Sequence, residues 1–380
     1  RDALACMQLK PDTVLDRAIA SEITLRDGAR AVILPTVAEV GGKVRVSAEI
    51  IDPHTQTTLY AESTDGRGFE STLGSIDVVT SSLRNKLGET VASIEQDSAP
   101  LPQVTTKNLD ALRAFALAQT AYAKYEYDDA LQLYQRATEL DPDFALAWLG
   151  QMRIHYGREN ADKAIAPLRK AQALQAHLAP RERMYLDAWV SEFDDPATTT
   201  GKWLELARLY PDFLGARANA SIWLYTENRF DEALKHAQAS TIPQNALSGQ
   251  SYDAVGRAYL GMENYASAED AFSRANAITG GSRRRLAATA AARGDFPLAK
   301  QRAKKLDTDN PFDYLELTSL SVDQGDLKGA LSLGQKGMVL AQPESDLGAR
   351  YMILPVAVVS LLSNDNPAAA RHAKDAAQKA

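Results

Sequence analysis

A repeat with a period of 34 residues limits the fold of this chain more than any other feature. A small, large, small triplet recurs at this interval, as Ala130, Tyr134, Ala137 and then Ala164, Leu168, Ala171. Small residues on a helix let a second helix cross closely, and the large residue fills the gap to the next pair. One helical hairpin cannot bury its apolar side alone, so the repeat predicts hairpins that stack into a solenoid.

Further copies of the pattern continue toward the end of the chain. The best has Tyr252–Tyr259 on a first helix and Ala268, Phe272, Ala275 on a second. Weaker copies place Asn228, Gly294, Gly325 or Asn366 in a short turn before the second helix. Counting a degenerate unit over 181–209, we predict roughly eight hairpins over 108–380.

The first unit, from Ala111 to Pro142, resembles a tetratricopeptide repeat (TPR). In that pattern the first helix has a large residue, then Leu-Gly or Leu-Ala, and then an aromatic residue. The second helix has Ala, an aromatic residue and Ala. The resemblance implies a mainly α fold, a right-handed superhelix of hairpins. The third unit departs from the pattern, because Asp194 to Gly201 reads as a lengthened turn, and this leaves the register over 181–215 open.

The first 98 residues have a different periodicity and predict a small α/β domain. Alternation over Lys43–Ile50 is typical of a half-buried strand. Ala31–Leu34 is apolar on both sides and indicates a more central strand, with Gly41-Gly42 as the turn between them. Thr57–Glu62 is a third strand. Helices are expected over 12–26 and over 71–95, with Ser71 as the N-cap of the second. Residues 99–107 contain two prolines and form the predicted linker.

This region is similar to the TolB-like module of bacterial membrane-bound signalling proteins. Gly28–Val37, Gly41–Asp52 and Thr55–Tyr60 carry the likeness, together with the junction Val104–Phe115. In such proteins an intracellular adenylate or guanylate cyclase, or a Ser/Thr kinase, precedes one membrane helix, this module and repeats; the cyclases of peptide modification systems are the nearest match. The resemblance implies a periplasmic location and a membrane-anchored parent. The module's first strand and helix are missing, so we expect the chain to begin inside it.

Composition excludes several classes of function. The 42 basic and 49 acidic residues leave a net charge of −7, which argues against a nucleic-acid partner. Cys6 alone supports neither an internal disulfide nor a cysteine zinc site. The longest near-continuous apolar run, 352–362, is too short to span a bilayer. We therefore expect no metal, no cofactor and no membrane insertion by this chain.

The common catalytic motifs are also absent from the sequence. There is no Gly-x-Gly-x-x-Gly, phosphate loop, His-Glu-x-x-His or Gly-x-Ser-x-Gly. His155 takes a packing position of the repeat, and Asp194-Asp195 reads as a solvated turn rather than a catalytic pair. Arg283-Arg284-Arg285 is either a charged helix start opposed by acids or a contact for an acidic peptide. We predict a chain that binds rather than catalyses.

The first helices of stacked hairpins line the concave side of a solenoid, so binding positions follow from the register. Aromatic and arginine side chains there suit a peptide or protein partner. The alternative is that several of them pack between hairpins. The predicted positions are Phe115, Gln119, Tyr122, Leu149, Arg153, Tyr156, Ile222, Tyr225, Asp253, Arg257 and Arg284. Three roles stay open. The first is the sensory and interaction region of a membrane signalling protein, and the second is a free-standing adaptor, which can be cytoplasmic. The third is a small-molecule-binding or hydrolytic enzyme that uses the solenoid interior.

Overall fold

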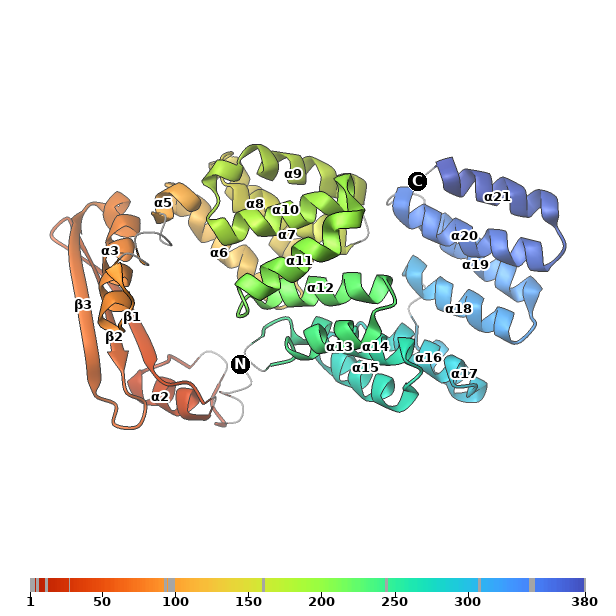
Figure 1. Ribbon diagram of the computed structural model, residues 1–380, viewed down its shortest axis with the longest axis horizontal. Coiled ribbons are helices and arrows are strands. Elements are labelled where there is room, and N and C mark those ends of the chain that lie inside the picture. Colours follow the sequence, from red (N-terminus) through yellow and green to blue (C-terminus); the bar gives the residue numbers. More distant parts are fainter. Residues whose placement is uncertain are drawn as a thin grey trace. The chain divides into compact units, whose positions relative to one another are not determined.

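The computed structural model describes residues 4, 7–10, 13–26, 28–91, 94, 100–158, 161–242, 245–306, 309–341 and 346–378. Its contacts divide the chain into two compact units, 1–112 and 113–380. The first is a small α/β unit and the second consists of helices, so the fold is mainly α, as predicted (Figure 1). The predicted linker over 99–107 falls inside the first unit and contains one short helix, α5 (Leu101–Val104).

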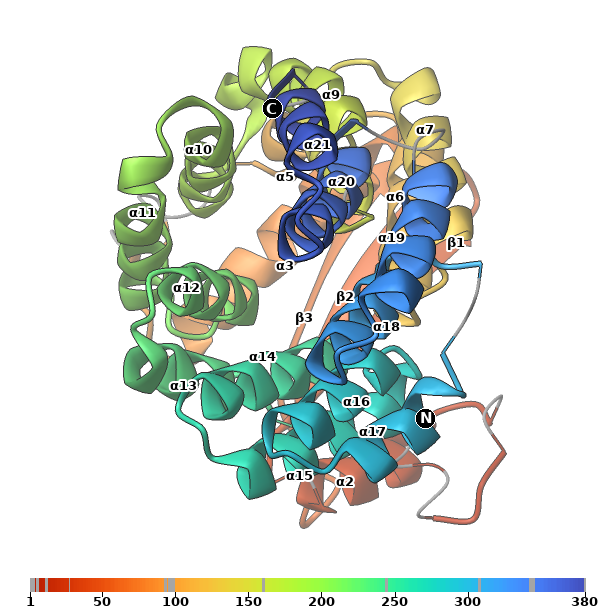
Figure 2. The same ribbon diagram turned by 90° about the vertical axis from the view of Figure 1, so that its right-hand side faces the viewer.

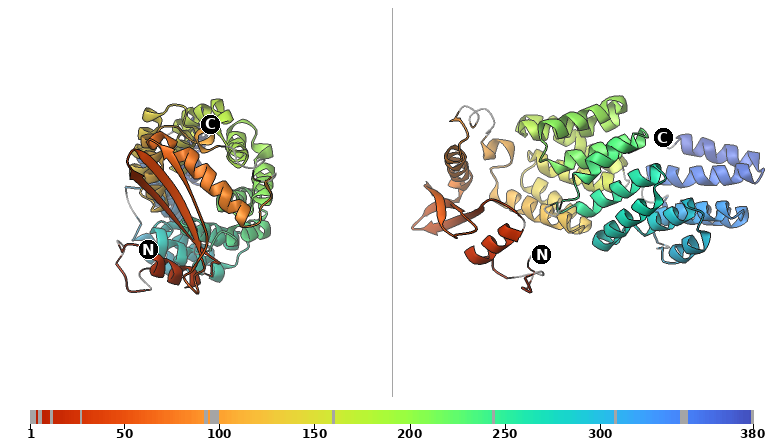
Figure 3. Two further views of the ribbon diagram at one scale, coloured as in Figure 1. Left: turned by 90° about the vertical axis from the view of Figure 1, so that its left-hand side faces the viewer. Right: turned by 60° about the horizontal axis from the view of Figure 1, so that its bottom comes forward.

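The α/β unit is built on three antiparallel strands in the order β1, β2, β3. They are β1 (Val32–Val40), β2 (Lys43–Ile51) and β3 (Thr58–Arg67), flanked by α2 (Arg17–Arg26), η1 (Phe69–Ser71) and α3 (Thr72–Lys86). Gly41 and Gly42, both at positive φ, join β1 to β2 in a two-residue turn. The alternation predicted for β2 is confirmed, because Val44, Val46 and Ile50 are buried in one cluster with Val79 and Leu83 of α3. The ribbon in Figure 3 shows this helix lying across the sheet.

Several details of this unit correct the sequence predictions. The expected central strand β1 is an edge strand, with Ile33 60% exposed, because β2 pairs on both sides and α3 packs against β2 and β3. The second helix ends at Lys86 rather than near residue 95. Ser71 does not cap it through its side chain, since its hydroxyl instead donates to the Gly68 carbonyl at 2.7 Å. The first helix begins at Arg17, and part of its predicted range, Asp12, lies outside the described residues.

Helices in the second part of the chain pair into successive hairpins (Figure 1). Figure 2 shows them winding around a common axis. The pairs are α6 (Leu109–Ala123) with α7 (Tyr127–Leu140), α8 (Ala145–Gly157) with α9 (Ala161–Ala173), α10 (Pro180–Asp194) with α11 (Pro196–Leu209), α12 (Leu214–Thr226) with α13 (Phe230–Gln238), α14 (Ser248–Gly261) with α15 (Tyr265–Thr279), α16 (Arg283–Ala292) with α17 (Phe296–Ala303), α18 (Pro311–Asp323) with α19 (Leu327–Ala341) and α20 (Asp346–Leu362) with α21 (Asn366–Gln378); a short η2 (Gln175–His177) follows α9. We number these hairpins 1 to 8.

The turn inside most hairpins uses one residue in the left-handed conformation. Asn228, Gly294 and Gly325 occupy this position as predicted, but in hairpin 8 it is Asn364, and Asn366 already begins α21. Glycine and asparagine adopt positive φ at low cost. Tyr125 in hairpin 1 and Glu263 in hairpin 5 adopt positive φ at a higher cost, so other contacts must hold them in this conformation.

Hairpin 3 overturns the prediction of a lengthened turn after Asp194. Only Asp195 separates α10 from α11, and the Pro196–Gly201 run is helical. Pro196 suits the first helical position, where its missing N–H costs nothing. Thr199 and Thr200 are buried, and the Thr200 hydroxyl donates to Glu227 at 2.6 Å. Threonines that look like a loop in the sequence are therefore accommodated by packing and by a partner 27 residues away.

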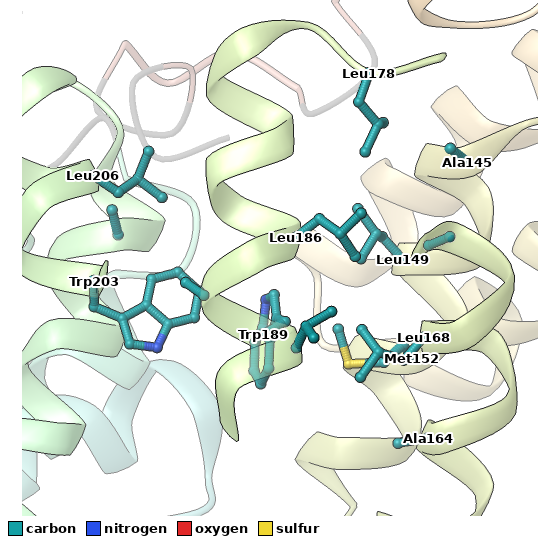
Figure 4. Close-up of a cluster of buried hydrophobic side chains, with 14 of the residues drawn as sticks. Ala145, Leu149, Met152, Ala164, Leu168, Leu178, Leu186, Trp189, Trp203 and Leu206 are labelled. Carbon is teal, nitrogen blue, oxygen red and sulfur yellow. The ribbon is translucent and has the colours of Figure 1, made fainter. Parts of the chain in front are cut away.

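The core of the helical unit passes from hairpin to hairpin. The largest cluster combines side chains of α8, α9, α10, α11 and α12, and Figure 4 shows Leu149 and Leu186 pointing toward one another across α8 and α10. The predicted small and large positions, Ala130 and Tyr134 among them, are fully buried, as are their later copies Ala268 and Phe272. This is the nearest-neighbour packing that a repeat needs in order to bury its apolar sides.

Candidate functional site

Four of the predicted binding residues lie together on α6 and α8. Gln119 and Tyr122 are three residues apart on α6, so their side chains share one face of that helix. Arg153 of α8 contacts this face. The Arg153 guanidinium lies over the Tyr122 ring, 4.3 Å from its centroid. The Tyr134 hydroxyl of α7 donates to Gln119 Oε1 at 2.7 Å. Phe115 packs below, with its ring centroid 5.7 Å from that of Tyr134.

Three tyrosines surround the Arg153 cation, and we call Tyr122, Tyr134 and Tyr185 the tyrosine cage. Burial alone lowers the Arg153 pKa, but interactions with Tyr185, Tyr122 and Tyr134 outweigh it and raise that pKa. Burial likewise raises the pKa of Tyr134 and of Tyr185 above the usual value for tyrosine. The Tyr134 and Tyr185 hydroxyls therefore stay protonated at neutral pH and carry no charge that could balance the arginine.

Arg153 has no carboxylate partner among the residues whose placement is described. Its side chain is half-buried. Guanidinium groups withdrawn from water are ordinarily paired. The described residues thus give Arg153 a polar, aromatic surrounding and no compensating negative charge.

Hairpin 1 also contacts hairpin 5, far along the chain, at the edge of the tyrosine cage. Gln250 Nε2 of α14 donates to the Tyr127 hydroxyl at 2.9 Å. The Tyr125 hydroxyl lies beside Gly249, where a Cβ would approach it to 3.1 Å. Tyr127 packs in turn on Tyr122, with centroids 5.4 Å apart, and burial raises the Tyr127 pKa to about 12. We call these contacts the clasp, because they join hairpins that are not sequence neighbours.

A second group of arginines lies on the first helices of hairpins 5 and 6. Asp253 accepts hydrogen bonds from Arg257 Nε and from Arg285 Nε, both at 2.8 Å, and from the Ser282 hydroxyl at 3.1 Å. Burial opposes ionisation of Asp253, but Arg285 and Arg257 lower its pKa. Burial lowers the Arg285 pKa to about 10. We call these four residues the Asp253 network.

Glu316 of α18 stands beside the Asp253 network. Burial raises its pKa to about 7, while Arg284 and Arg285 pull that pKa down and Asp323 and Asp313 push it up. The Arg284 guanidinium lies 6.0 Å from the centroid of Phe312. The arginine run is therefore a helix start opposed by acidic side chains, the first of its two interpretations, with Arg285 in the Asp253 network and Arg284 beside Glu316.

The other predicted positions are more scattered. Leu149 is only 2% exposed and belongs to the core, so the prediction that it lines a groove is wrong. Tyr156 packs edge-on against Trp189, and Tyr225 packs against Phe230. Ile222 is 43% exposed and stands apart from both arginine groups in the contacts that the structure describes. Asp253 and Arg257 meet each other rather than open solvent.

Sequence reasoning missed Tyr127, Tyr185, Arg285 and Glu316. Arg285 belonged to a run that was noticed, but it meets Asp253 from another hairpin, which helical spacing does not predict. Tyr185 was hidden because the register of hairpin 3 was open. Glu192, also missed, accepts hydrogen bonds from Trp203 Nε1 at 3.0 Å and Trp223 Nε1 at 2.8 Å, and burial raises its pKa. It serves as a buried acceptor for two indoles.

A pocket of about 470 Å³ is lined by residues of α13, α14 and α15 and of the segment that follows α13. Asp270 and Arg274 of α15, which form an ion pair at 3.0 Å, are both among its lining residues. The lining residues are Gln238, Thr241, Tyr252, Val255, Tyr259, Ala266, Ser267, Asp270, Ala271 and Arg274. Sequence analysis did not predict this pocket, because its lining combines three helices.

Within the described parts of the chain, no group of three His, Cys, Asp or Glu side chains is placed to hold a metal ion. Burial lowers the pKa of His155, as in a packing position. Among the helices that the structure places, none has both the length and the apolar character needed to cross a bilayer.

Comparison with known proteins supports the fold. No family model and no curated protein matches the chain. Among solved structures, a monomeric mutant of IFIT1 with Gppp-AAAA is similar at 13% identity and a TM-score of 0.50, covering 83% of this chain and 82% of that one. YrrB, a TPR protein with an unusual peptide-binding site, shares 24% identity over 45% of this chain and 88% of its own, with a TM-score of 0.27. A TPR protein from Parabacteroides merdae shares 12% identity over 63% of this chain and 99% of its own, with a TM-score of 0.40. The helical unit has the fold of a TPR solenoid.

Proposed function

We propose that the helical unit binds a peptide or protein segment along the side formed by its first helices. One observation carries this proposal: aromatic and cationic side chains of successive first helices meet at the tyrosine cage instead of pairing with acids there. Aromatic rings offer flat apolar contact, and arginine offers directional donors, which is the composition of binding hot spots. The chain then acts as a non-catalytic interaction region.

The test is to capture partners from the source cells with the purified chain and with variants at the tyrosine cage. Tyr122→Ala and Arg153→Gln should weaken capture at least tenfold if this side binds. Arg136→Gln is the control, since Arg136 lies on the second helix α7 with its side chain 59% exposed. Equal recovery of the same partners by all variants would place binding elsewhere on the molecule.

We further propose that this interaction region belongs to a bacterial membrane signalling protein linked to a cyclase or kinase, and faces the periplasm. The support is the resemblance of 28–60 and 104–115 to a TolB-like module and its junction, followed by hairpins. A free-standing adaptor is the second candidate, favoured by a helical unit that is compact by itself. Protease treatment of spheroplasts distinguishes them: an antibody to the hairpins should detect loss of a membrane-bound protein, whereas a protected, freely soluble protein supports the adaptor.

A further inference from the structure

The two edge strands of the α/β unit offer different backbone groups to solvent. The two-residue turn at 41–42 makes Val40 and Lys43 a hydrogen-bonded pair, so every second residue back from Val40 bonds to β2. Pro35 lies between these residues, and its backbone faces away from β2. Because proline has no N–H, the outer edge of β1 lacks a donor near its middle, which hinders the pairing of a further strand.

The other edge of the described sheet, β3, has no such block. The Gly68 N–H donates to the Gly42 carbonyl at 3.3 Å, so by the same alternation the even-numbered residues of β3 bond to β2. The N–H and C=O groups of Ala61, Ser63 and Asp65 therefore face away from the sheet. All three residues are exposed, and none is a proline. Over this stretch β3 presents a complete row of donors and acceptors to a further strand.

Helix α3 has an uncovered flank beside this open strand edge. Val79 of α3 packs in the cluster with β2, whereas Lys86 forms an ion pair with Glu62 of β3. Val78, Ser82 and Lys86 follow one another at intervals of four residues, so they share the flank of α3 on the β3 side. Val78 is 54% exposed there. An apolar side chain and a small hydroxyl side chain thus lie open next to the row of free backbone groups.

We propose that a second copy of this chain pairs with the β3 edge, so that two three-stranded sheets form one antiparallel sheet across a two-fold axis. This inference is independent of peptide binding by the helical unit. With the axis at Ser63, nearly the whole of β3 is paired, and Ala61 lies opposite Asp65 of the second copy. Glu62 then lies opposite Thr64, and no two like charges face each other directly.

A second copy also supplies a neighbour for the open flank of α3. Strands lie about 4.8 Å apart, and α3 packs over both β2 and β3, so its axis lies about 2.4 Å inside β3. A two-fold axis midway between two paired β3 strands then places the two α3 axes about 10 Å apart, within the range at which helices pack. A single extended peptide would satisfy the strand edge but leave Val78 uncovered. The geometry therefore favours a second copy over a peptide.

The first experiment places a charge on the proposed axis of the full chain. The wild type should sediment as a dimer, and Ser63→Lys or Ser63→Asp, which sets like charges opposite each other, should raise its dissociation constant at least tenfold. An equimolar mixture of the two variants should restore the dimer. Thr36→Lys and Thr36→Asp are the controls, because Thr36 lies in the same row of the sheet but on β1, and they should leave the dimer unchanged. A wild type that stays monomeric up to about 100 μM overturns the proposal, as does a dimer that the Ser63 variants do not weaken.

The second experiment tests the contact between the two α3 helices. Val78→Lys places a charge in that contact and should also raise the dissociation constant at least tenfold. Val37→Lys is the matched control, since Val37 is 52% exposed on β1 and lies away from the axis. Equal dissociation constants for Val78→Lys and the wild type overturn the two-fold arrangement.

Amide hydrogen exchange distinguishes the second copy from other occupants of the edge. The N–H groups of Ala61, Ser63 and Asp65 should exchange more slowly as the protein concentration rises, while those of Glu62 and Thr64, which bond to β2 in either state, should not change. A dimer in which the three outward groups exchange fast uses another surface and overturns the proposal. Slow exchange of these groups in a monomer assigns the edge to another segment and overturns it too.

Discussion

The tyrosine cage and the Asp253 network place the same kind of residue on equivalent first helices with opposite outcomes. In the Asp253 network one carboxylate balances Arg257 and Arg285 at 2.8 Å each, so the charges are satisfied within the chain. In the tyrosine cage Arg153 meets a ring and neutral hydroxyls. The difference teaches that an inward arginine in a solenoid is either part of the scaffold or part of a site, and that its counter-charge tells which.

The largest effect is expected from breaking the Asp253 network. Asp253→Ala leaves two half-buried guanidinium groups unpaired, which should lower the free energy of unfolding by about 3–5 kcal/mol. Urea denaturation followed by circular dichroism measures this. Asp270→Ala, which removes an exposed partner of Arg274, is the matched control and should change stability little. Similar losses in both variants would show that the Asp253 network is no more than a surface pair.

The second effect is a pH dependence centred on Glu316. Its pKa in the folded chain is raised to about 7, so folding favours the protonated acid. That contribution is complete below the ordinary glutamate pKa and is lost as pH rises through 7. Glu316→Gln should therefore have little effect at pH 4 and stabilise the chain by about 1–2 kcal/mol at pH 8, less than a fully buried acid would give. A constant difference between wild type and variant from pH 4 to 8 would contradict the raised pKa.

The third effect compares two strained turns, Tyr125 in hairpin 1 and Glu263 in hairpin 5, both at positive φ. Glycine at either position removes the conformational cost. Glu263→Gly should therefore stabilise the chain by up to about 1 kcal/mol. Tyr125→Gly should not, because it also removes the side chain that lies beside Gly249. Thermal melts of the two variants are compared, and an equal gain in both would show that the clasp contributes nothing.

The fourth effect, similar in size to the third, is expected at the single hydrogen bond of the clasp. Gln250→Ala removes the donor to Tyr127, which costs about 0.5–1.5 kcal/mol. Tyr127→Phe should cost a similar amount, and the double variant should cost no more than either single one, since both remove the same bond. Hydrogen exchange of α7 and α14 measures the coupling. Additive losses would mean that the two residues act separately.

Much of the architecture followed from local patterns. Ala130, Tyr134 and Ala137 are completely buried at the predicted interval, and Val44, Val46 and Ile50 face the helix as the alternation required. Such patterns are reliable because side chains that face the core recur at the period of the helix or strand, and this period can be read in the sequence. The errors fell where local signals were ambiguous: an apolar run in β1 that forms an edge, and a threonine-rich stretch that became helix α11.

The candidate site was only partly predictable. The register placed Gln119, Tyr122 and Arg153 on one side, and the structure brings them together. In the structure, however, Leu149 lies in the core. Asp253 forms an ion pair with Arg285, which lies 32 residues away on another hairpin. Spacing identifies the face on which a side chain lies, whereas the next hairpin determines what that face meets.

By itself the sequence determined that the helices pair and where small residues let them cross. It also determined which strand alternates between buried and exposed side chains. These features depend on neighbours within one helical turn or one pleat of a strand. Only the tertiary structure decided that Tyr127 reaches Gln250 across 123 residues and that, within the described parts of the chain, Arg257 pairs with a carboxylate while Arg153 does not. The physical reason is that charge compensation and burial depend on the angle at which whole hairpins stack, and that angle is the sum of many packing contacts that no single motif contains.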